Sequence, residues 1–350
     1  MNQEQEIQDF NKSKIYERLD YVKEPANYDL KIPWIVQQQI AATNGRHYID
    51  RIGKLNEYPV YELPVKAVTG NKLMLDIGCG WGRWLVAGAN KGYTPIGVDL
   101  RLEFCQTSLN VLKDLNKVGY TLVADLEELP FKDSIFDLVW SFSVIQHTHH
   151  SRLVNCLYHI NRILLDDGFT MLEFPNKDGI RNSMSSVLAS EKNKNNYNSW
   201  CVRYYNPKEY KLIVEKYLNN FSYSNHSFLG IGVLKEDLKY VSAKNKILTS
   251  VSLLLSQFAD LIPTLKKYSD SIYINASKKK SIGNVNSLPK QLASKSQDNL
   301  SIIPLLKCPK YGGDLSLSND RKKLTSLEAG IYYPIENDIP ILIKSEALAC

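Results

Sequence analysis

Three alternating glycines interrupt an apolar stretch early in the chain. Gly78, Gly80 and Gly82 follow the run 73–77, LMLDI, which reads as a short buried strand, and they precede the start of a helix. Glycine reaches positive φ values and has no Cβ, so the turn can be tight and a ligand can approach the backbone closely. The first turn of the helix presents unpaired N–H groups and a partial positive charge. The sequence therefore predicts a small-molecule cradle between this strand and this helix.

The spacing of the glycines separates two kinds of cradle. Dinucleotide-binding folds carry G-x-G-x-x-G, in which the third glycine packs the helix against the sheet. Arg83 occupies that third position here, and Asp76 stands two positions before the first glycine. The stretch 76–82, DIGCGWG, resembles the first motif of the class I, Rossmann-like S-adenosylmethionine-dependent methyltransferases. The resemblance implies that the turn holds the methionine end of the cofactor and that Asp76 helps to place its amino group.

Further motifs follow in the order and at the spacing of that family. The run 94–100, TPIGVDL, contains Asp99, and a carboxylate at the end of a second strand can bind both ribose hydroxyls; the alternative is a solvated strand-end acid. The run 122–126, LVADL, resembles the adenine-binding stretch, and 129–131 with 136–141, LPF and FDLVWS, resemble the fourth motif. The resemblance implies that S-adenosyl-L-methionine is the cofactor, bound by Asp76, Gly78, Gly80, Gly82, Asp99, Asp125, Leu126 and Ser141.

The alternation of apolar runs and helical patterns predicts the fold class. Strand and helix patterns alternate over 73–176, which favours a parallel sheet covered on both faces. Helical spacing covers 101–117 and 151–165, and Asn206 with Pro207 starts another helix. Segments 221–228 and 271–276 are the expected last two strands, which in the family form an antiparallel pair at one edge. We expect an α/β fold: a seven-stranded, mostly parallel, doubly wound sheet with a small C-terminal β-rich, ribbon-like domain.

The length of 350 residues suggests more than one domain. We expect an N-terminal helical segment over 1–70, the methyltransferase domain over 71–277, a flexible linker over 278–300 and a small domain over 301–347. In the family a segment such as 1–70 often closes over the cofactor or builds the acceptor pocket; alternatively, its aromatic residues only fasten helices to the sheet. Two insertions are expected in the catalytic domain, near 177–205 and 235–268. The first, rich in Ser, Asn and Lys, is either a substrate-shaping loop or disordered.

The second insertion carries a wide apolar stripe at helical spacing. Pro263 should end or kink this helix. Such a stripe covers a core or a partner surface in most proteins. Lysines at both ends also allow peripheral membrane contact through 247–265. The stripe consists of Ile247, Val251, Leu254, Phe258, Leu261 and Leu265, widened by Leu253, Leu255 and Ile262.

The tail shows a second resemblance. The runs 305–315, LLKCPKYGGDL, and 331–342, IYYPIENDIPIL, resemble a small zinc-ribbon family that includes the activator subunit of tRNA and protein methyltransferases. Metal-binding members carry C-x-x-C pairs because tetrahedral zinc needs four ligands. Here Cys308 remains, Tyr311 replaces its partner, and Cys350 lies outside the motif. We therefore expect a relative without bound metal that docks on the catalytic domain, because so small a core is hard to stabilise alone. Tethering would raise its effective concentration.

Composition and charge exclude few function classes. A net charge of +6 permits an anionic substrate or a membrane surface but gives no strong nucleic-acid signal. The six cysteines show no paired spacing, which favours reduced thiols and a cytoplasmic location over a disulfide framework. The polar, acidic start of the chain is unlike a signal peptide, and no apolar run approaches the ~18 residues that span a bilayer.

The sequence indicates less about the acceptor than about the cofactor. Residues 141–144, SFSV, stand where methylases of nucleobases or glutamine carry N/D-P-P-Y/F, which counts against those acceptors. His147 matches a histidine of many small-molecule members, where it is often structural; it is the candidate general base, with Gln146 and Asn176 as candidate acceptor contacts. We expect methyl transfer to a small-molecule, lipid-linked or sugar-linked acceptor at oxygen, carbon or nitrogen. The alternatives are an RNA or protein methyltransferase with its activator in the same chain, and a non-catalytic cofactor-binding scaffold.

Overall fold

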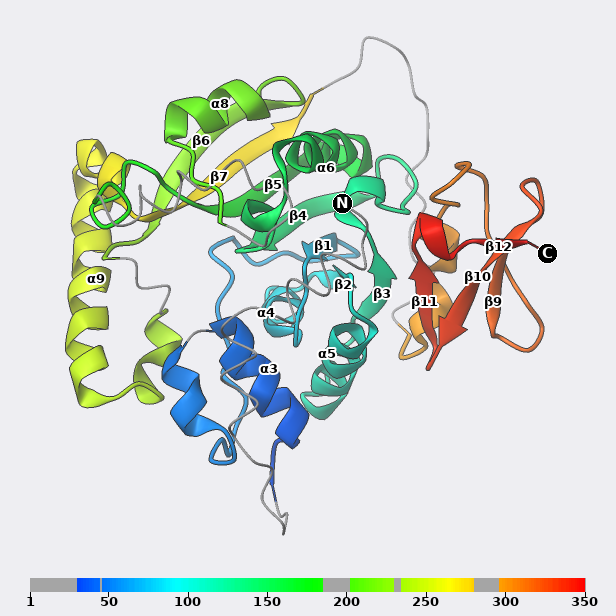
Figure 1. Ribbon diagram of the computed structural model, residues 1–350, viewed down its shortest axis with the longest axis horizontal. Coiled ribbons are helices and arrows are strands. Elements are labelled where there is room, and N and C mark those ends of the chain that lie inside the picture. Colours follow the sequence, from blue (N-terminus) through cyan, green and yellow to red (C-terminus); the bar gives the residue numbers. More distant parts are fainter. Residues whose placement is uncertain (1–29, 45, 185–201, 230–233, 280–295, 350) are drawn as a thin grey trace.

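A mixed β-sheet runs through the centre of the chain, with helices on both faces (Figure 1). The computed structural model describes residues 30–44, 46–184, 202–229, 234–279 and 296–349. The expectations for 1–29, for most of the insertion at 177–205 and for most of the linker therefore lie outside the described residues.

Seven strands of this sheet are mostly parallel, with an antiparallel pair at one edge, as predicted. The path is β6 (Leu218–Ser227), β7 (Ser271–Lys278), β5 (Leu164–Pro175), β4 (Phe136–Phe142), β1 (Leu73–Ile77), β2 (Thr94–Asp99) and β3 (Tyr120–Ala124). From β5 to β3 all neighbours pair in parallel, whereas β7 pairs antiparallel with both β5 and β6. The carboxyl ends of the parallel strands therefore meet at one edge of the sheet, where ligands bind in such folds.

The helices divide between the two faces of the sheet. On one face lie α6 (His150–Ile163) and α8 (Pro207–Val214), and on the other α3 (Trp34–Asn44), α4 (Arg83–Asn90) and α5 (Leu102–Asp114) (Figure 1). Each face has its own buried apolar cluster. A further helix, α9 (Ala243–Leu261), packs beside the edge strand β6. The short 3-10 helices are η1 (Arg46–Arg51), η2 (Leu126–Glu128), η3 (Ile145–His147), η5 (Lys235–Lys239), η6 (Pro263–Tyr268), η7 (Asn299–Leu305) and η8 (Lys344–Glu346).

Most element ends follow the local sequence signals. The Asn206 side chain accepts hydrogen bonds from the Lys208 and Glu209 amides at 3.0 and 2.9 Å, which caps α8 as expected. Pro263 separates α9 from η6, as predicted. Two predicted ends were too late: α5 stops at Asp114, before the predicted residue 117, and α6 stops at Ile163 because Leu164 already pairs with Phe136 of β4.

The N-terminal segment 30–70 packs on the α4 face. Its apolar side chains belong to the same buried cluster as Trp81 and Trp84, beside the glycine turn. The Asn44 side chain accepts a hydrogen bond from Trp81 Nε1 at 3.1 Å. Tyr48 and Tyr61 both donate to Asp237 of η5, at 2.5 and 2.6 Å. This segment is therefore fixed to both the turn and the second insertion.

The C-terminal strands extend the sheet. They are β8 (Ser316–Leu317), β9 (Lys323–Ser326), β10 (Ile331–Glu336), β11 (Ile339–Leu342) and β12 (Leu348–Ala349). β11 pairs in parallel with β3, placing Ile341 opposite Val123 and Leu342 opposite Ala124, so the described strands form one 12-stranded sheet. The sequence predicted a seven-stranded sheet and a small C-terminal β-rich domain that docks on the catalytic domain. In the structure this contact is a strand pairing, because β11 completes the open edge of β3.

Side chains and loops reinforce this contact. The Asn299 side chain accepts from Thr121 N at 2.8 Å and donates to Thr121 O and Asp338 O at 2.9 and 2.8 Å. Lys344 forms an ion pair with Glu128 at 2.9 Å. The contacts begin at Ser296, whose N–H donates to the Tyr120 hydroxyl, so the C-terminal end of the expected linker is part of the interface.

We predict that Asn299→Ala destabilises the whole chain. Loss of the amide leaves the buried N–H and carbonyl of Thr121 without partners, which costs about 1–3 kcal/mol of the free energy of unfolding. Urea unfolding followed by circular dichroism measures this change. Asn219→Ala, on the exposed part of β6, is the control, with an expected change within about 0.5 kcal/mol. Equal stability of the two variants would contradict the prediction.

Candidate cofactor and acceptor site

The glycine turn joins β1 to α4 at the carboxyl edge of the sheet. Gly78, Gly80 and Gly82 have φ values of 77°, 53° and 94°, which side-chain-bearing residues rarely adopt. A Cβ at Gly78 would lie 2.3 Å from a methyl carbon of Val144, on the loop after β4. The turn therefore requires glycine for its conformation and, at Gly78, for the close approach of that loop.

Asp76 is buried in β1, and none of the described residues forms a hydrogen bond with its carboxylate. It is 0% exposed, and both carboxylate oxygens are covered and make no hydrogen bond. Burial raises the pKa of Asp76 to about 8, although the nearby Arg83 opposes this rise. Buried carboxylates are nearly always paired or hydrogen-bonded because an isolated charge loses its hydration. Among the described residues, the Asp76 carboxylate therefore lacks the hydrogen-bond partner that a buried carboxylate usually has.

Arg83, the first residue of α4, is buried with only 9% of its surface exposed. The guanidinium carbon lies 4.6, 5.2 and 5.7 Å from the ring centroids of Phe142, Trp84 and Tyr61. It makes no hydrogen bond and no ion pair with any of the described residues. Ring faces stabilise a guanidinium but leave its five N–H donors unused. Sequence reasoning noted Arg83 only as the residue that excludes the dinucleotide pattern, and did not identify it as a site residue.

Asp99 connects β2 to the turn. Its carboxylate accepts hydrogen bonds from the backbone N–H groups of Gly80 and Arg101, each at 3.1 Å. Burial raises the pKa of Asp99 to about 6, and the backbone hydrogen bonds limit the rise. The carboxylate therefore lies directly beside the glycine turn.

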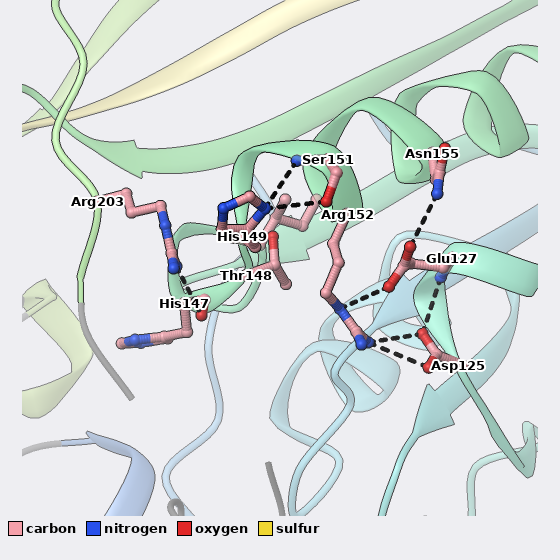
Figure 2. Close-up of polar contacts among 10 residues, drawn as sticks. Asp125, Glu127, His147, Thr148, His149, Ser151, Arg152, Asn155 and Arg203 are labelled. Atoms are coloured by element: carbon pink, nitrogen blue, oxygen red, sulfur yellow. Dashed lines mark hydrogen bonds and ion pairs between the residues drawn. The ribbon is translucent and has the colours of Figure 1, made fainter. Parts of the chain in front are cut away.

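Asp125 follows β3 and is held by an ionic network (Figure 2). Arg152 of α6 contacts its two oxygens at 2.9 and 3.1 Å, and Glu127 N donates to one of them at 2.9 Å. Arg152 also pairs with Glu127 at 2.8 Å. Leu126 starts η2 and is buried. The network fixes the carboxylate, and Arg152 is a residue that sequence reasoning missed because it lies 27 positions away.

Residues after β4 approach the turn from the other side. The buried Ser141 hydroxyl donates to Ile77 O at 3.1 Å, so in this structure it links β4 to β1. Gln146 and His147 lie in η3, and their side-chain nitrogens are 3.3 Å apart. Arg203 donates to the carbonyls of both residues at 3.0 Å, while the His147 ring points away from Asp125 (Figure 2).

Asn176, at the end of β5, is fully buried, and both polar atoms of its side chain are hydrogen-bonded. Its side-chain nitrogen donates to the carbonyls of Lys267 and Ser269 at 2.8 and 2.7 Å. Its oxygen accepts from Asp178 N at 3.1 Å. In this structure the side chain joins β5 to η6 and offers no polar group to an acceptor.

Three further residues lie near the Arg83 guanidinium on the side of β5, β7 and β6. Glu173 accepts hydrogen bonds from Ser143 at 2.7 Å and from Ser271, and burial raises its pKa. The His226 ring lies 4.7 Å from that of Tyr273, and burial with Arg83 lowers the pKa of His226 to about 3. The electrostatic influence of Arg83 reaches all three residues. No sequence motif identified them, because they come from three strands that only the fold brings together.

Metal ligands are not clustered in the part of the chain that the structure describes: no group of three or more His, Cys, Asp or Glu side chains could hold an ion there. The Cys308 thiol contacts the Tyr333 hydroxyl at 3.5 Å. Likewise, none of the described helices is long and apolar enough to cross a membrane.

Comparison with known proteins agrees with this geometry. The family described as "Methyltransferase domain" matches residues 75–172, which run from within β1 to within β5 and include Asp76, Asp99 and Asp125. The uncharacterized protein MJ0638 of Methanocaldococcus jannaschii is 33% identical over 108 residues, which are 31% of this chain and 43% of that protein. A malonyl-[acyl-carrier protein] O-methyltransferase of Buchnera aphidicola is 39% identical over 71 residues, 20% of this chain and 27% of that enzyme. The chain thus spans less than half of these relatives.

The C-terminal region matches a different group. A UPF0434 protein of Ectopseudomonas mendocina is 43% identical over 49 residues, which are 14% of this chain and 80% of that protein. Together with the sheet order and the glycine turn, the matches identify the two parts of the chain. It contains a class I, S-adenosylmethionine-dependent methyltransferase domain, and its C-terminal segment belongs to the UPF0434 family.

Proposed function

We propose that the chain transfers the methyl group of S-adenosylmethionine to a small-molecule, lipid-linked or sugar-linked acceptor, at oxygen, carbon or nitrogen. One observation carries the proposal: the Asp76 carboxyl and the Arg83 guanidinium are buried beside the same glycine turn. Among the described residues neither Asp76 oxygen has a hydrogen-bond partner, and the Arg83 guanidinium lies against aromatic rings. Such a pair matches a ligand that brings both an ammonium and a carboxylate. The methionine end of the cofactor has these two groups.

Each charge would acquire its missing partner in the loaded site. Asp76 would accept from the α-ammonium, which would favour the ionised carboxylate and reverse the rise of its pKa. Arg83 would donate to the α-carboxylate in the forked geometry that guanidinium and carboxylate share. The amino end of α4 adds a partial positive charge on the same side. The residues present therefore fit the cofactor.

The other predicted ligands would hold the adenosine. Asp99 would bind the ribose hydroxyls, since it lies at the end of β2 beside the turn. Asp125 would accept from the exocyclic amine, and Leu126 would meet the ring through its backbone. The Arg152 network would keep the Asp125 carboxylate oriented, so Arg152 is a positioning residue.

The acceptor would lie on the side of β4, β5 and β7, next to Arg83. Bound cofactor supplies an electrophilic methyl group on a sulfonium, and in-line transfer depends chiefly on alignment and exclusion of water. The aromatic side chains Phe142, Trp84 and Tyr273 would provide a dry wall for this step. His147 remains the predicted general base for acceptors that lose a proton. Burial lowers the pKa of His226, on the β6 side, to about 3, which makes this ring a weak base.

The C-terminal segment would act on the catalytic domain within the same chain. Its pairing with β3 ends at Ala124, directly before Asp125, so it would stabilise the strand that positions the adenine ligand. This contact favours the in-cis activator alternative, in which the acceptor is RNA or protein. Residues 141–144 lack the N/D-P-P-Y/F motif, which favours acceptors other than nucleobases or glutamine. The expected domain limits and the expected absence of zinc at Cys308 remain predictions.

Removal of the Asp76 charge should change the pH dependence of stability. The folded-state pKa of about 8 lies above the unfolded value, so without cofactor the free energy of unfolding falls as pH rises towards 8. In Asp76→Asn this loss is absent. The stability difference, variant minus wild type, should rise between pH 5 and 8 by up to about 1.4 kcal/mol per pH unit. Urea unfolding without ligand measures it. Asp178→Asn, at an exposed site, controls for the lost charge; a difference independent of pH would contradict the prediction.

The two ends of the cofactor can be tested separately by calorimetry. Arg83→Gln should weaken S-adenosylhomocysteine by about tenfold to a hundredfold, because a charge-assisted contact is lost. It should leave 5′-methylthioadenosine unchanged, because this ligand lacks the amino-acid group. Asp99→Ala should weaken both ligands, because both carry the ribose. Equal losses of both ligands in Arg83→Gln would show that Arg83 supports the fold instead.

Methyl transfer itself is tested with isotopically labelled S-adenosylmethionine and extracts of the source cell. Mass spectrometry should find labelled product in the small-molecule or lipid fraction with wild-type chain, and none with Asp99→Ala. Label in RNA or protein would favour the in-cis activator alternative. Cofactor binding with no labelled product in any fraction would favour the non-catalytic scaffold.

A further inference from the structure

Helix α9 buries small and polar side chains and exposes apolar ones, which is the reverse of an ordinary amphipathic helix. Its buried residues are small and largely polar: Thr249, Ser252 and Ala259 are 1%, 2% and 0% exposed. Its apolar stripe faces outward. The exposed apolar side chains are Ile247, Leu248, Val251, Leu254, Phe258, Leu261 and Ile262, with exposures between 41% and 78%. The sequence predicted that this stripe covers a core or a partner surface, and within the described chain it covers no core.

Hydrogen bonds hold the helix in this orientation. The Ser252 hydroxyl accepts from Phe228 N at 3.1 Å and donates to Phe228 O at 2.9 Å. Asn225 donates to Ser256 O at 3.1 Å. These contacts fix the polar side of α9 on the edge strand β6 and the residue after it, with α9 beside that edge of the sheet (Figure 1). The apolar side therefore faces away from the sheet. A contiguous apolar face at the surface marks an interaction site.

Positively charged lysine side chains lie at both ends of this apolar face. Exposed Lys246 lies at the first turns, and Lys266 and Lys267 lie in η6 beyond the last turn. Residues 243–268 contain four lysines and one acidic residue, Asp260. Tyr268 is 43% exposed, with the Lys267 ammonium 4.7 Å from its ring centroid. Tyrosine and lysine beside an apolar face suit the boundary between lipid headgroups and acyl chains.

Charge also argues against a second copy of the chain as the occupant. A twofold contact places the same face of both copies against each other. In the antiparallel arrangement of two such helices, Lys246 of one copy would meet Lys266 and Lys267 of the other, and like charges would repel. An anionic lipid surface instead attracts the lysines at both ends while the apolar side chains enter the headgroup region.

We propose that the outward face of α9 docks the chain on an anionic membrane surface. The helix would lie in the plane of the interface, with the stripe buried and its lysines among the headgroups. The segment that follows α9 is joined to the ligand edge of the sheet, because the carbonyls of Lys267 and Ser269 accept hydrogen bonds from Asn176 at the end of β5. Docking would therefore bring a lipid-linked acceptor close to the acceptor side of the site. The docking itself does not depend on the proposed methyl transfer.

Vesicle co-sedimentation of the full chain tests the proposal. Wild type should bind phosphatidylcholine vesicles that contain about 30% phosphatidylglycerol, bind pure phosphatidylcholine far less, and lose affinity as salt is raised. Leu254→Gln/Phe258→Gln should weaken binding at least tenfold, roughly the loss of two inserted apolar side chains. Lys266→Gln/Lys267→Gln should weaken it by about 20-fold. The matched control is Leu212→Gln/Leu327→Gln, which removes two apolar side chains that are 71% and 79% exposed elsewhere; it should bind as wild type does.

Each other result would overturn docking. Wild type that does not bind anionic vesicles, or that binds as tightly after Leu254→Gln/Phe258→Gln, would exclude this face. A doubled mass in light scattering that Leu254→Gln/Phe258→Gln abolishes, without vesicle binding, would assign the face to a second copy. S-adenosylhomocysteine binding by every variant serves as the folding check. If the wild type does not bind S-adenosylhomocysteine, the proposed function is wrong, and the result of the vesicle experiment remains valid.

Discussion

The burial of two opposite charges beside the glycine turn constrains the rest of the site. The positions of Asp76 in β1 and of Arg83 at the start of α4 are fixed relative to each other. The turn between them is held by glycines in conformations that other residues rarely adopt. Aromatic rings surround Arg83 and supply no acceptor, so its donors stay available. Burial of Asp76 disfavours its ionised form and raises its pKa to about 8, so the folded state loses stability as the pH rises towards that value. Stability and ligand affinity are therefore coupled at this turn.

The second constraint is the edge of β3. An unpaired edge strand is a template for association, and here β11 covers it in parallel register. The same strand delivers Asp125 to the site, and the Arg152 network and the Lys344–Glu128 pair anchor the residues that follow. The UPF0434 segment thus belongs to the architecture of the cofactor side, whereas α9 belongs to the opposite edge of the sheet. The two additions occupy the two ends of the strand order.

Local patterns were sufficient for most elements. The alternation of strands and helices predicted a mostly parallel sheet with an antiparallel pair at one edge, and the capping residues placed the start of α8. Periodicity detected the α9 stripe but could not orient it, because a helical pattern states which residues share a face and not which face meets the sheet. The Ser252 bonds to Phe228 decide that orientation, and they join residues 24 positions apart. Asn176 and Ser141 show the same limit: both lie at the ligand edge, but backbone carbonyls occupy their side chains.

The sequence by itself determined the glycine turn and the acids at or near the ends of three successive strands, and it carried the resemblance to methyltransferases, because these depend on residue types at short fixed spacings. Only the tertiary structure decided which charged groups lack partners. Arg83 appeared in the sequence as an interruption of a motif, and it became a ligand candidate once Phe142 and Trp84 were seen to cover it without pairing it. Likewise, only the structure showed that β11 completes β3 and that α9 turns its apolar face outward. Burial and hydrogen-bond satisfaction are properties of distant segments brought together, and no local pattern contains them.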